Sequence, residues 1–154
     1  MVQRFDISNG KELLIINTHN SAYDSDGFLR KGQLAYLKEF LLKEYSKGNY
    51  IAVGGDWNQC PPDLKITFDQ NLLDTVDYSL IDSNYLPADW QWIYDPAVPT
   101  NRRVMTEFNP EITPQTLIDF YLFSPNIEII ENKTFDLSFT YSDHQPIYAK
   151  FKLK

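Results

Sequence analysis

The sequence predicts an α+β domain, a β-sheet with one long helix packed on one of its faces. Two short runs, residues 14–16 and 51–53, are apolar at every position, which is typical of strands buried on both faces. One segment, from Leu29 to about Ser46, repeats its apolar residues at helical spacing. At 154 residues, the chain is long enough for a single domain with a sizeable core.

Composition and charge restrict the class of protein. A hydrophobic content of 43%, with 15% aromatic residues, indicates a globular chain. The net charge of −7 argues against a broad phosphate-binding face, although clustered acids could still ligate a metal. The single cysteine, Cys60, excludes an internal disulfide framework, and no apolar run approaches membrane-spanning length.

The chain is expected to begin with a β-hairpin. Val2 to Ile7 and Glu12 to Thr18 have strand-like composition, and Asn9-Gly10 lies between them. Asn-Gly between two strand-like runs is a strong hairpin signal.

A helix and a returning strand come next. Asp24 to Gly27 supply turn and cap residues, and Gly48 is suited to the position just beyond the helix end. The predicted apolar stripe consists of Leu34, Leu37, Phe40, Leu41 and Tyr45. The strand from Tyr50 to Gly54 then returns, and such a long crossover favours parallel pairing with the strand before the helix.

The second half of the chain is less regular. Residues 59–75 are predicted to form a loop with short structure. The aromatic stretch from Trp90 to Tyr94 either faces a substrate or packs as a loop. Further strands are predicted over Leu117 to Phe123, over Ile127 to Ile130 and over Pro146 to Leu153.

Asp56 and Asn58 are the first candidate site residues. They follow Gly54-Gly55 at the end of a buried strand, and residues two apart in extended backbone point the same way. An acid beside an amide can orient a water molecule and hold a phosphate oxygen. The same pattern is also ordinary turn chemistry, so it does not decide the matter alone.

Two histidines and two further aspartates add to the candidates. His19 and His144 both lie at predicted strand ends. Asp119 lies inside an otherwise apolar strand, where a buried carboxylate is costly unless it is paired, so it needs a partner such as a histidine. The alternative is a hydrogen-bonded core aspartate without a role, or a carboxylate at an exposed strand end. Asp143 precedes His144 and could ligate a hard divalent cation, although Ser142-Asp143-His144 is also an ordinary turn sequence.

Taken in order, four motifs resemble the endonuclease/exonuclease/phosphatase superfamily, which includes DNase I, AP endonucleases, inositol polyphosphate 5-phosphatases and sphingomyelinases. The motifs are Asn17-Thr18-His19, Gly55-Asp56-Trp57-Asn58, Ile118-Asp119-Phe120 and Ser142-Asp143-His144. The resemblance implies half of a DNase I-like α/β-sandwich: a mostly antiparallel sheet, one long helix on one face and a second sheet against the other.

The resemblance also implies metal-assisted hydrolysis of phosphoesters, usually with Mg²⁺ and alternatively with Mn²⁺. Asp56 would orient or deprotonate the attacking water, and Asn58 would steady it and the phosphoryl group. His144, held by Asp119, would contact phosphate oxygens. His19 would act as a general acid or phosphate contact.

Two further residues receive roles from the same resemblance. Asn17 would contribute to substrate binding, and Asp143 would lie at or near the metal together with Asp56. The substrate is left open among nucleic acid, sugar or inositol phosphates and lipid headgroups, and the net charge does not favour nucleic acid.

The sequence departs from the family pattern at its start. Family members have an N-terminal half that supplies an asparagine and the main metal-binding glutamate, and no counterpart precedes Val2. Many members also have arginine where this chain has Ile118. The chain is therefore expected to be the C-terminal half of a domain, weak or inactive alone.

Two other expectations follow. An uncovered apolar sheet face favours a homodimer with its sheets face to face. The alternative function is a non-catalytic, β-rich binding or interaction module, which the aromatic stretch and the negative charge support.

Overall fold

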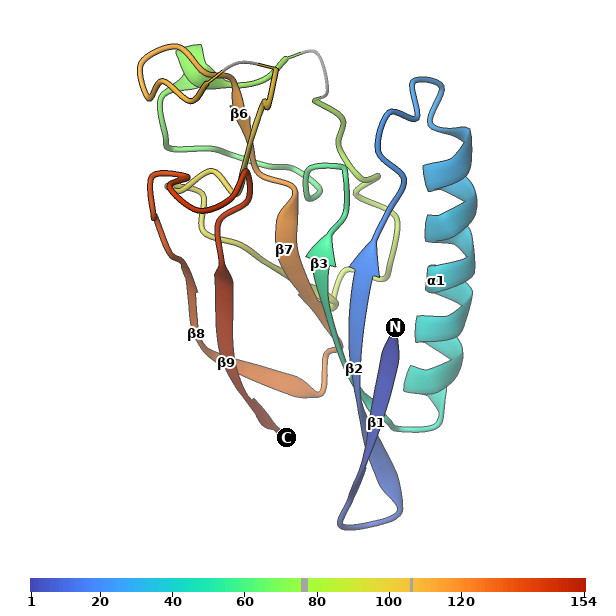
Figure 1. The fold of residues 1–154 in the computed structure, drawn as a ribbon. Helices are drawn as coiled ribbons and strands as arrows, with labels where there is room; N and C mark the ends of the chain where they lie inside the picture. The colour runs from blue at the N-terminus through green and yellow to red at the C-terminus, as the bar shows by residue number, and fades with distance from the viewer. Residues whose placement is uncertain (76–77, 106) are drawn as a thin grey trace.

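The computed structural model describes residues 1–75, 78–105 and 107–154. Its central element is a five-stranded sheet with strand order β1-β2-β3-β7-β4 (Figure 1). β2 and β3 run parallel, and the other neighbouring pairs are antiparallel. The five strands are β1 Val2–Ile7, β2 Lys11–His19, β3 Tyr50–Asp56, β7 Asp119–Phe123 and β4 Gln91–Ile93. The predicted hairpin and the parallel crossover are both confirmed.

Four shorter or separate strands complete the fold. β5 (Asn101–Arg102) pairs with β6 (Gln115–Thr116), and β8 (Ile127–Thr134) pairs with β9 (Ile147–Leu153). A short 3₁₀ turn, η1 (Gln70–Leu72), is the only helical structure in the described part of the loop predicted from residue 59 to 75.

The long helix α1 (Phe28–Ser46) covers one face of the sheet, as predicted (Figure 1). Gly27 precedes it in the left-handed conformation, and the Asp24 carboxylate accepts hydrogen bonds from the backbone N–H groups of Leu29 and Arg30. Gly48, with φ of 84°, follows the helix in the left-handed conformation. The core between helix and sheet includes Leu14, Leu34, Leu41, Ile51, Val53, Trp57, Phe120 and Leu122.

The opposite face of the sheet meets the β8–β9 pair. Tyr50, Ala52, Phe123 and Ile127 form a second apolar cluster there. Partly buried Phe151 from β9 packs against that cluster. The expected meeting of this face with a second sheet is thus partly provided by the chain itself, and the fold is α+β as predicted.

One predicted strand begins later than expected. The run from Leu117 to Phe123 is apolar, yet β7 starts only at Asp119. The N–H groups of Ile118 and Asp119 both donate to the side-chain oxygen of Thr100, at 3.0 and 2.9 Å, rather than to β3. This side chain therefore separates β6 from β7.

The strand predicted over Ile127 to Ile130 is longer than expected. β8 continues to Thr134 because its charged residues pair across to β9, with Glu128 opposite Lys152 and Glu131 opposite Lys150.

The structure also bears on membrane insertion. Within the described ranges, no helix combines the length and the apolar character needed to cross a membrane.

A buried carboxylate links the helix to the edge of the sheet. Glu44 on α1 accepts hydrogen bonds from Arg4 of β1 at 3.1 Å, from Lys47 at 2.7 Å and from Asn49 at 3.0 Å. The Arg4 hydrogen bond, with Lys47 and Asn49, outweighs the opposing effect of burial and lowers the pKa of Glu44 to about 2.

We predict that Glu44→Gln lowers the free energy of unfolding at neutral pH by ~1–2 kcal/mol, because Arg4 and Lys47 are partly exposed and solvent screens the pairing. The folded-state pKa lies below the unfolded value. The contribution is therefore complete above about pH 4.5 and is lost as the pH falls toward 2. Urea unfolding at pH 7 and pH 3 checks this, with Glu39→Gln, on an exposed position of the same helix, as the control.

Candidate active site

Three polar side chains form a row across the end of the sheet. The register pairs His19 of β2 with Asp56 of β3, and Asp56 with Asp119 of β7. Because paired residues on neighbouring strands point to the same face, all three lie on the face opposite α1. The Nε2 atom of His19 lies 3.6 Å from Oδ2 of Asp56, although the His19 side chain is 75% exposed.

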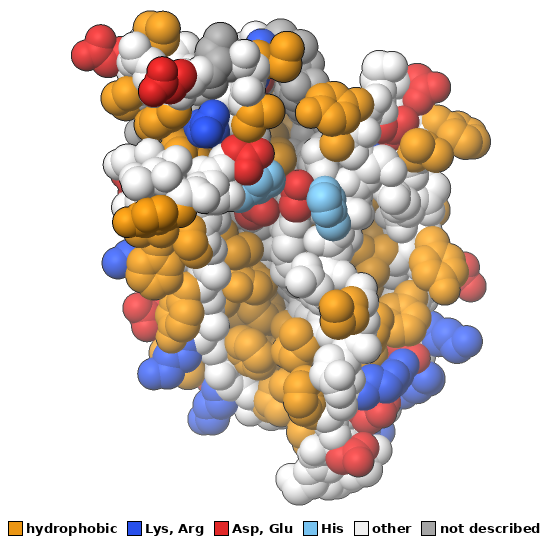
Figure 2. All heavy atoms as spheres, viewed as in Figure 1, with side chains coloured by type: hydrophobic (Ala, Val, Ile, Leu, Met, Phe, Trp, Pro, Cys, Tyr) orange, Lys and Arg blue, Asp and Glu red, His pale blue; other side chains and the backbone are white. Residues whose placement is uncertain are grey.

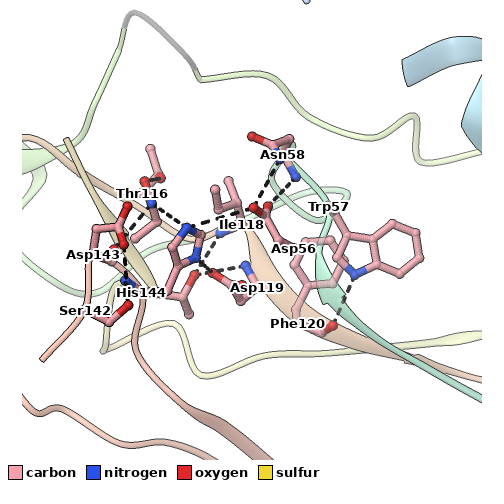
Figure 3. Close-up of polar contacts among 12 residues, drawn as sticks. Asp56, Trp57, Asn58, Thr116, Ile118, Asp119, Phe120, Ser142, Asp143 and His144 are labelled. Carbon is pink, nitrogen blue, oxygen red and sulfur yellow. Dashed lines mark hydrogen bonds and ion pairs between the residues drawn. The ribbon is translucent and has the colours of Figure 1, made fainter. Parts of the chain in front are cut away.

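His144 reaches this row from the loop before β9 (Figure 3). Its Nδ1 lies 2.8 Å from Oδ2 of Asp119, and its Nε2 lies 3.9 Å from Oδ2 of Asp56. The His144 backbone N–H donates to Ser142 Oγ at 3.1 Å, which orders the loop. The half-buried Asp119 carboxylate thus has the histidine partner that its place in an apolar strand predicted.

Asp56 and Asn58 form a tight turn beyond β3. The Asn58 backbone N–H donates to Oδ1 of Asp56 at 2.8 Å, and the Asn58 side-chain amide donates to Oδ2 of Asp56 at 3.1 Å. The same amide donates to the carbonyl of Asn20 at 2.8 Å, and Asn58 has φ of 48°. The pattern is therefore turn chemistry that also holds a carboxylate in a fixed orientation beside His144.

The electrostatics of the site make Asp56 more basic and His144 easier to protonate. Burial is the main cause that raises the pKa of Asp56, and the nearby Asp119 charge adds to it. The hydrogen bond to Asp119 is the main cause that raises the pKa of His144. Protonated His144 would lie between two carboxylates and balance part of their charge.

Sequence reasoning missed two residues that hold this arrangement. Asn101 Nδ2 lies 3.0 Å from His144 Nε2, and its Oδ1 accepts a hydrogen bond from Thr116 at 3.3 Å. The Thr100 hydroxyl accepts the N–H groups of Ile118 and Asp119 at the start of β7. Both residues follow Pro99 in an irregular stretch with no periodic pattern, so no sequence signal marked them.

An amide is well suited to its place beside His144. Neutral imidazole that donates from Nδ1 to Asp119 leaves Nε2 as an acceptor for an N–H of Asn101. Imidazolium would donate from Nε2, and Asn101 could present its oxygen after a half-turn of the amide. Asn101 can therefore orient the ring in either protonation state.

Two predicted site residues lie at the margin. Asn17 pairs with Gly54, two positions before the His19–Asp56 pair, and it lines the cleft beside the row. The Asp143 carboxylate contacts Ser142 Oγ at 3.4 Å, and in Figure 3 it lies on the other side of the His144 ring from Asp56. The Asp143 backbone carbonyl accepts the N–H of Arg102 at 3.0 Å, which ties this loop to β5.

The donor set does not amount to a metal site. In the described part of the chain, no group of three or more His, Cys, Asp and Glu side chains could hold a metal ion. The Asp119 carboxylate already contacts His144 at 2.8 Å, and Asp143 and Asp56 lie on opposite sides of the His144 ring (Figure 3). The predicted pair of metal ligands, Asp56 and Asp143, is therefore not part of a three-donor group in the described ranges.

An apolar cleft of about 430 Å³ begins at the row and continues between β2, β3, β7 and β9. Figure 2 shows this hollow below the two histidines, with hydrophobic side chains along it. The side chains that line it include Ile15, Ala52, Tyr121, Phe123, Ala149 and Phe151. Asn17, Gly55 and Asp119 form its polar end.

No protein-family model matches the sequence, and no curated protein sequence matches it. Solved structures do. The 3′ phosphatase NExo from Neisseria, bound to a product DNA hairpin, is 22% identical with a TM-score of 0.65, and 98% of this chain covers 64% of it. An AP endonuclease from Archaeoglobus fulgidus is 16% identical with a TM-score of 0.62, over 99% of this chain and 65% of the enzyme.

A third similar structure is TDP2 of D. rerio complexed with a single-strand DNA product. It is 17% identical with a TM-score of 0.62, over 98% of this chain and 60% of TDP2. The chain thus spans about three fifths of the length of each of these proteins. Their likeness shows that the chain has the fold of the endonuclease/exonuclease/phosphatase, or DNase I-like, superfamily, as the four motifs implied.

We predict that Asp119→Asn lowers the pKa of His144, because it removes the charge that stabilises imidazolium through the 2.8 Å contact. NMR titration of the His144 ring protons measures this change. Asp143→Asn is the matched control, since Asp143 acts on His144 only through space and is the weakest contributor. An equal effect of the two substitutions would contradict the assigned pairing.

Proposed function

We propose that the chain carries the phosphate-binding and water-activating part of a phosphoester hydrolase. The observation that carries this proposal is the convergence of Asp56, Asp119 and His144, with both carboxylates within 4 Å of one imidazole. Such a site offers a base, a cation and fixed amide groups around one small volume. Positioning and charge neutralisation of this kind provide most of the catalysis in phosphoryl transfer.

In this proposal, Asp56 is the general base that orients the attacking water. Its raised pKa makes it a stronger base than an exposed aspartate, and Asn58 fixes both of its oxygens. Activity would rise with pH as Asp56 loses its proton.

His144 supplies positive charge to the phosphoryl oxygens in this scheme. Asp119 keeps the ring oriented and favours imidazolium, and Asn101 holds the edge that faces the substrate. Activity would fall again at the higher pH at which His144 loses its proton, which predicts a bell-shaped profile.

His19 and Asn17 complete the proposed set at the open side of the site. The exposed His19 ring, 3.6 Å from Asp56, is placed to protonate a leaving group or contact a phosphate. Asn17 would bind substrate oxygens from the polar end of the cleft, and Asn58 would do so from the turn beyond β3.

The proposed hydrolase would use Mg²⁺ or Mn²⁺, with Asp56 and Asp143 contributing to the site. Since these side chains do not make a cation site by themselves, the missing donors must come from residues outside this set, such as a glutamate on a further polypeptide segment. We therefore propose that the isolated chain has weak activity or none.

The alternative is a non-catalytic binding module, and the aromatic stretch from Trp90 to Tyr94 no longer favours it. Trp90 is 5% exposed, and Trp92 packs in the core with ring centroids 5.6 Å from Trp57 and 5.8 Å from Phe120. The aromatic stretch is therefore part of the packing and offers little binding surface.

For the substrate, we propose a phosphoester, with DNA as the class to test first because NExo and TDP2 were solved with DNA products.

The first test is phosphate binding. We predict that inorganic phosphate shifts the backbone amide of Asn58 and the ring signals of His144 in a saturable NMR titration. His144→Ala should abolish the shift at Asn58, whereas Asp89→Asn, at an exposed position outside the site, should leave it unchanged. Shifts that avoid both residues would overturn the proposed phosphate site.

The second test is turnover of p-nitrophenyl phosphate, bis(p-nitrophenyl) phosphate and a single-stranded DNA oligonucleotide with Mg²⁺ or Mn²⁺. Any activity of the chain should fall by about 100-fold or more in Asp56→Asn and in His144→Ala. Fast turnover that His144→Ala abolishes would show that the chain is complete for catalysis. Turnover insensitive to both substitutions would contradict the assigned roles.

A further inference from the structure

The outer edge of β1 is the most exposed part of the sheet. β1 ends the five-stranded sheet and pairs only with β2 among the described strands (Figure 1). Five of its six residues are exposed, including two large apolar ones, Val2 at 44% and Phe5 at 48%. Proteins normally shorten, charge or cover such an edge, because unpaired backbone groups recruit another strand.

The hydrogen-bond pattern shows which backbone groups of β1 point away from β2. Met1 and Asn17 exchange both of their backbone hydrogen bonds, at 2.8 and 2.9 Å. In an antiparallel pair such residues alternate, so Gln3 and Phe5 also direct their backbone groups toward β2. Val2, Arg4 and Asp6 therefore present their N–H and C=O groups to the outer edge.

The charges along β1 are unbalanced in the single chain. Asp6 lies opposite Glu12 in the β1–β2 register, and like charges directly opposite destabilise a sheet. Arg4 forms ion pairs with Glu12 and Glu44. The Asp6 carboxylate has no hydrogen bond or ion pair within the described residues, so it lacks a cation.

We propose that this edge binds a second copy of the chain, with the two β1 strands antiparallel around a two-fold axis at Phe5. The β1 edges then share one continuous sheet. Phe5 faces Phe5 of the second copy, and Arg4 of each chain lies opposite Asp6 of the other. Arg4 and Asp6 direct their backbone groups to the outer edge, so each Arg4–Asp6 pair exchanges backbone hydrogen bonds once the Gln3 side-chain amide releases the Arg4 carbonyl, to which it donates at 3.2 Å.

Charge selects this register over its neighbours. In an antiparallel ladder, two directly paired residues direct their backbone groups either both toward each other or both away from each other. In a symmetric dimer, the two-fold axis must therefore pass at a residue that pairs with its own copy, not between two successive residues. An axis at Arg4 places two arginines opposite each other, and an axis at Asp6 places two aspartates opposite each other. Only the axis at Phe5, among these three central positions, gives Asp6 a cation and pairs two exposed aromatic rings.

This contact differs from the face-to-face pairing expected from the sequence. β8 and β9 already lie over part of that sheet face, whereas the described residues leave the β1 edge open. A symmetric dimer is also the commonest way for a soluble protein to bury such a surface.

Light scattering on the full chain tests the proposal. The expected mass is twice the 18.0 kDa of one chain. Phe5→Lys should give a monomer, because two like charges would face each other at the axis. Tyr36→Lys, which changes a 76% exposed aromatic residue on α1, should remain a dimer.

Asp6→Arg separates the dimer contact from the folding of the chain. It places a cation opposite Glu12 and so should raise the melting temperature of the monomer, yet it sets arginine against Arg4 of the second copy and should abolish the dimer. Phe5→Cys should form a disulfide-linked dimer on oxidation, because facing residues of this kind have Cα atoms about 4.5 Å apart.

Two results would overturn the proposal. One is a monomeric wild-type chain at the highest soluble concentration. The other is a dimer that survives Phe5→Lys and Asp6→Arg but dissociates in Ile15→Lys, which would place the contact on the sheet face instead.

Discussion

Two carboxylates face each other across the ladder between β3 and β7, and the rest of the site follows from this constraint. The register that buries Val53 against Leu122 also sets Asp56 opposite Asp119. Like charges at that spacing repel, so a cationic or hydrogen-bonding group must come between or beside them. His144 does so from another part of the chain, and Asn101 in turn holds His144. The pairing of β3 with β7 therefore determines both the packing of the sheet core and the position of the site residues.

Strong local signals explain what could be predicted from the sequence. The hairpin, the helix and the polar strand ends depend on turn residues and periodicity, which act within a few positions. The histidine partner of Asp119 is predictable for another reason, because an unpaired buried carboxylate is energetically costly. Asn101 and Thr100 depend on contacts with residues 15 or more positions away, such as Thr116 and Ile118. No local pattern carries such information, and the same holds for the continuation of β8 to Thr134.

The two faces of the sheet differ in how completely the chain covers them. α1 and the aromatic residues around Trp57 fill one side. On the other side, the β8–β9 pair covers β3 and β7 and leaves the cleft beside Ile15. The similar solved structures are longer than this chain by roughly two fifths of their own length. The cleft therefore lies on the side of the sheet that the chain covers less completely.

Trp57 separates Asp56 from Asn58 in the sequence, and its side chain points to the opposite side of the sheet. It is fully buried, donates from Nε1 to the carbonyl of Phe120 at 3.1 Å and stacks on the Phe120 ring with centroids 5.1 Å apart. A substitution that repacks this aromatic cluster would therefore also rotate the turn that carries both polar neighbours. Change in the face that carries the candidate site is thus coupled to the packing behind it, and amino-acid changes in one are expected to require compensating changes in the other.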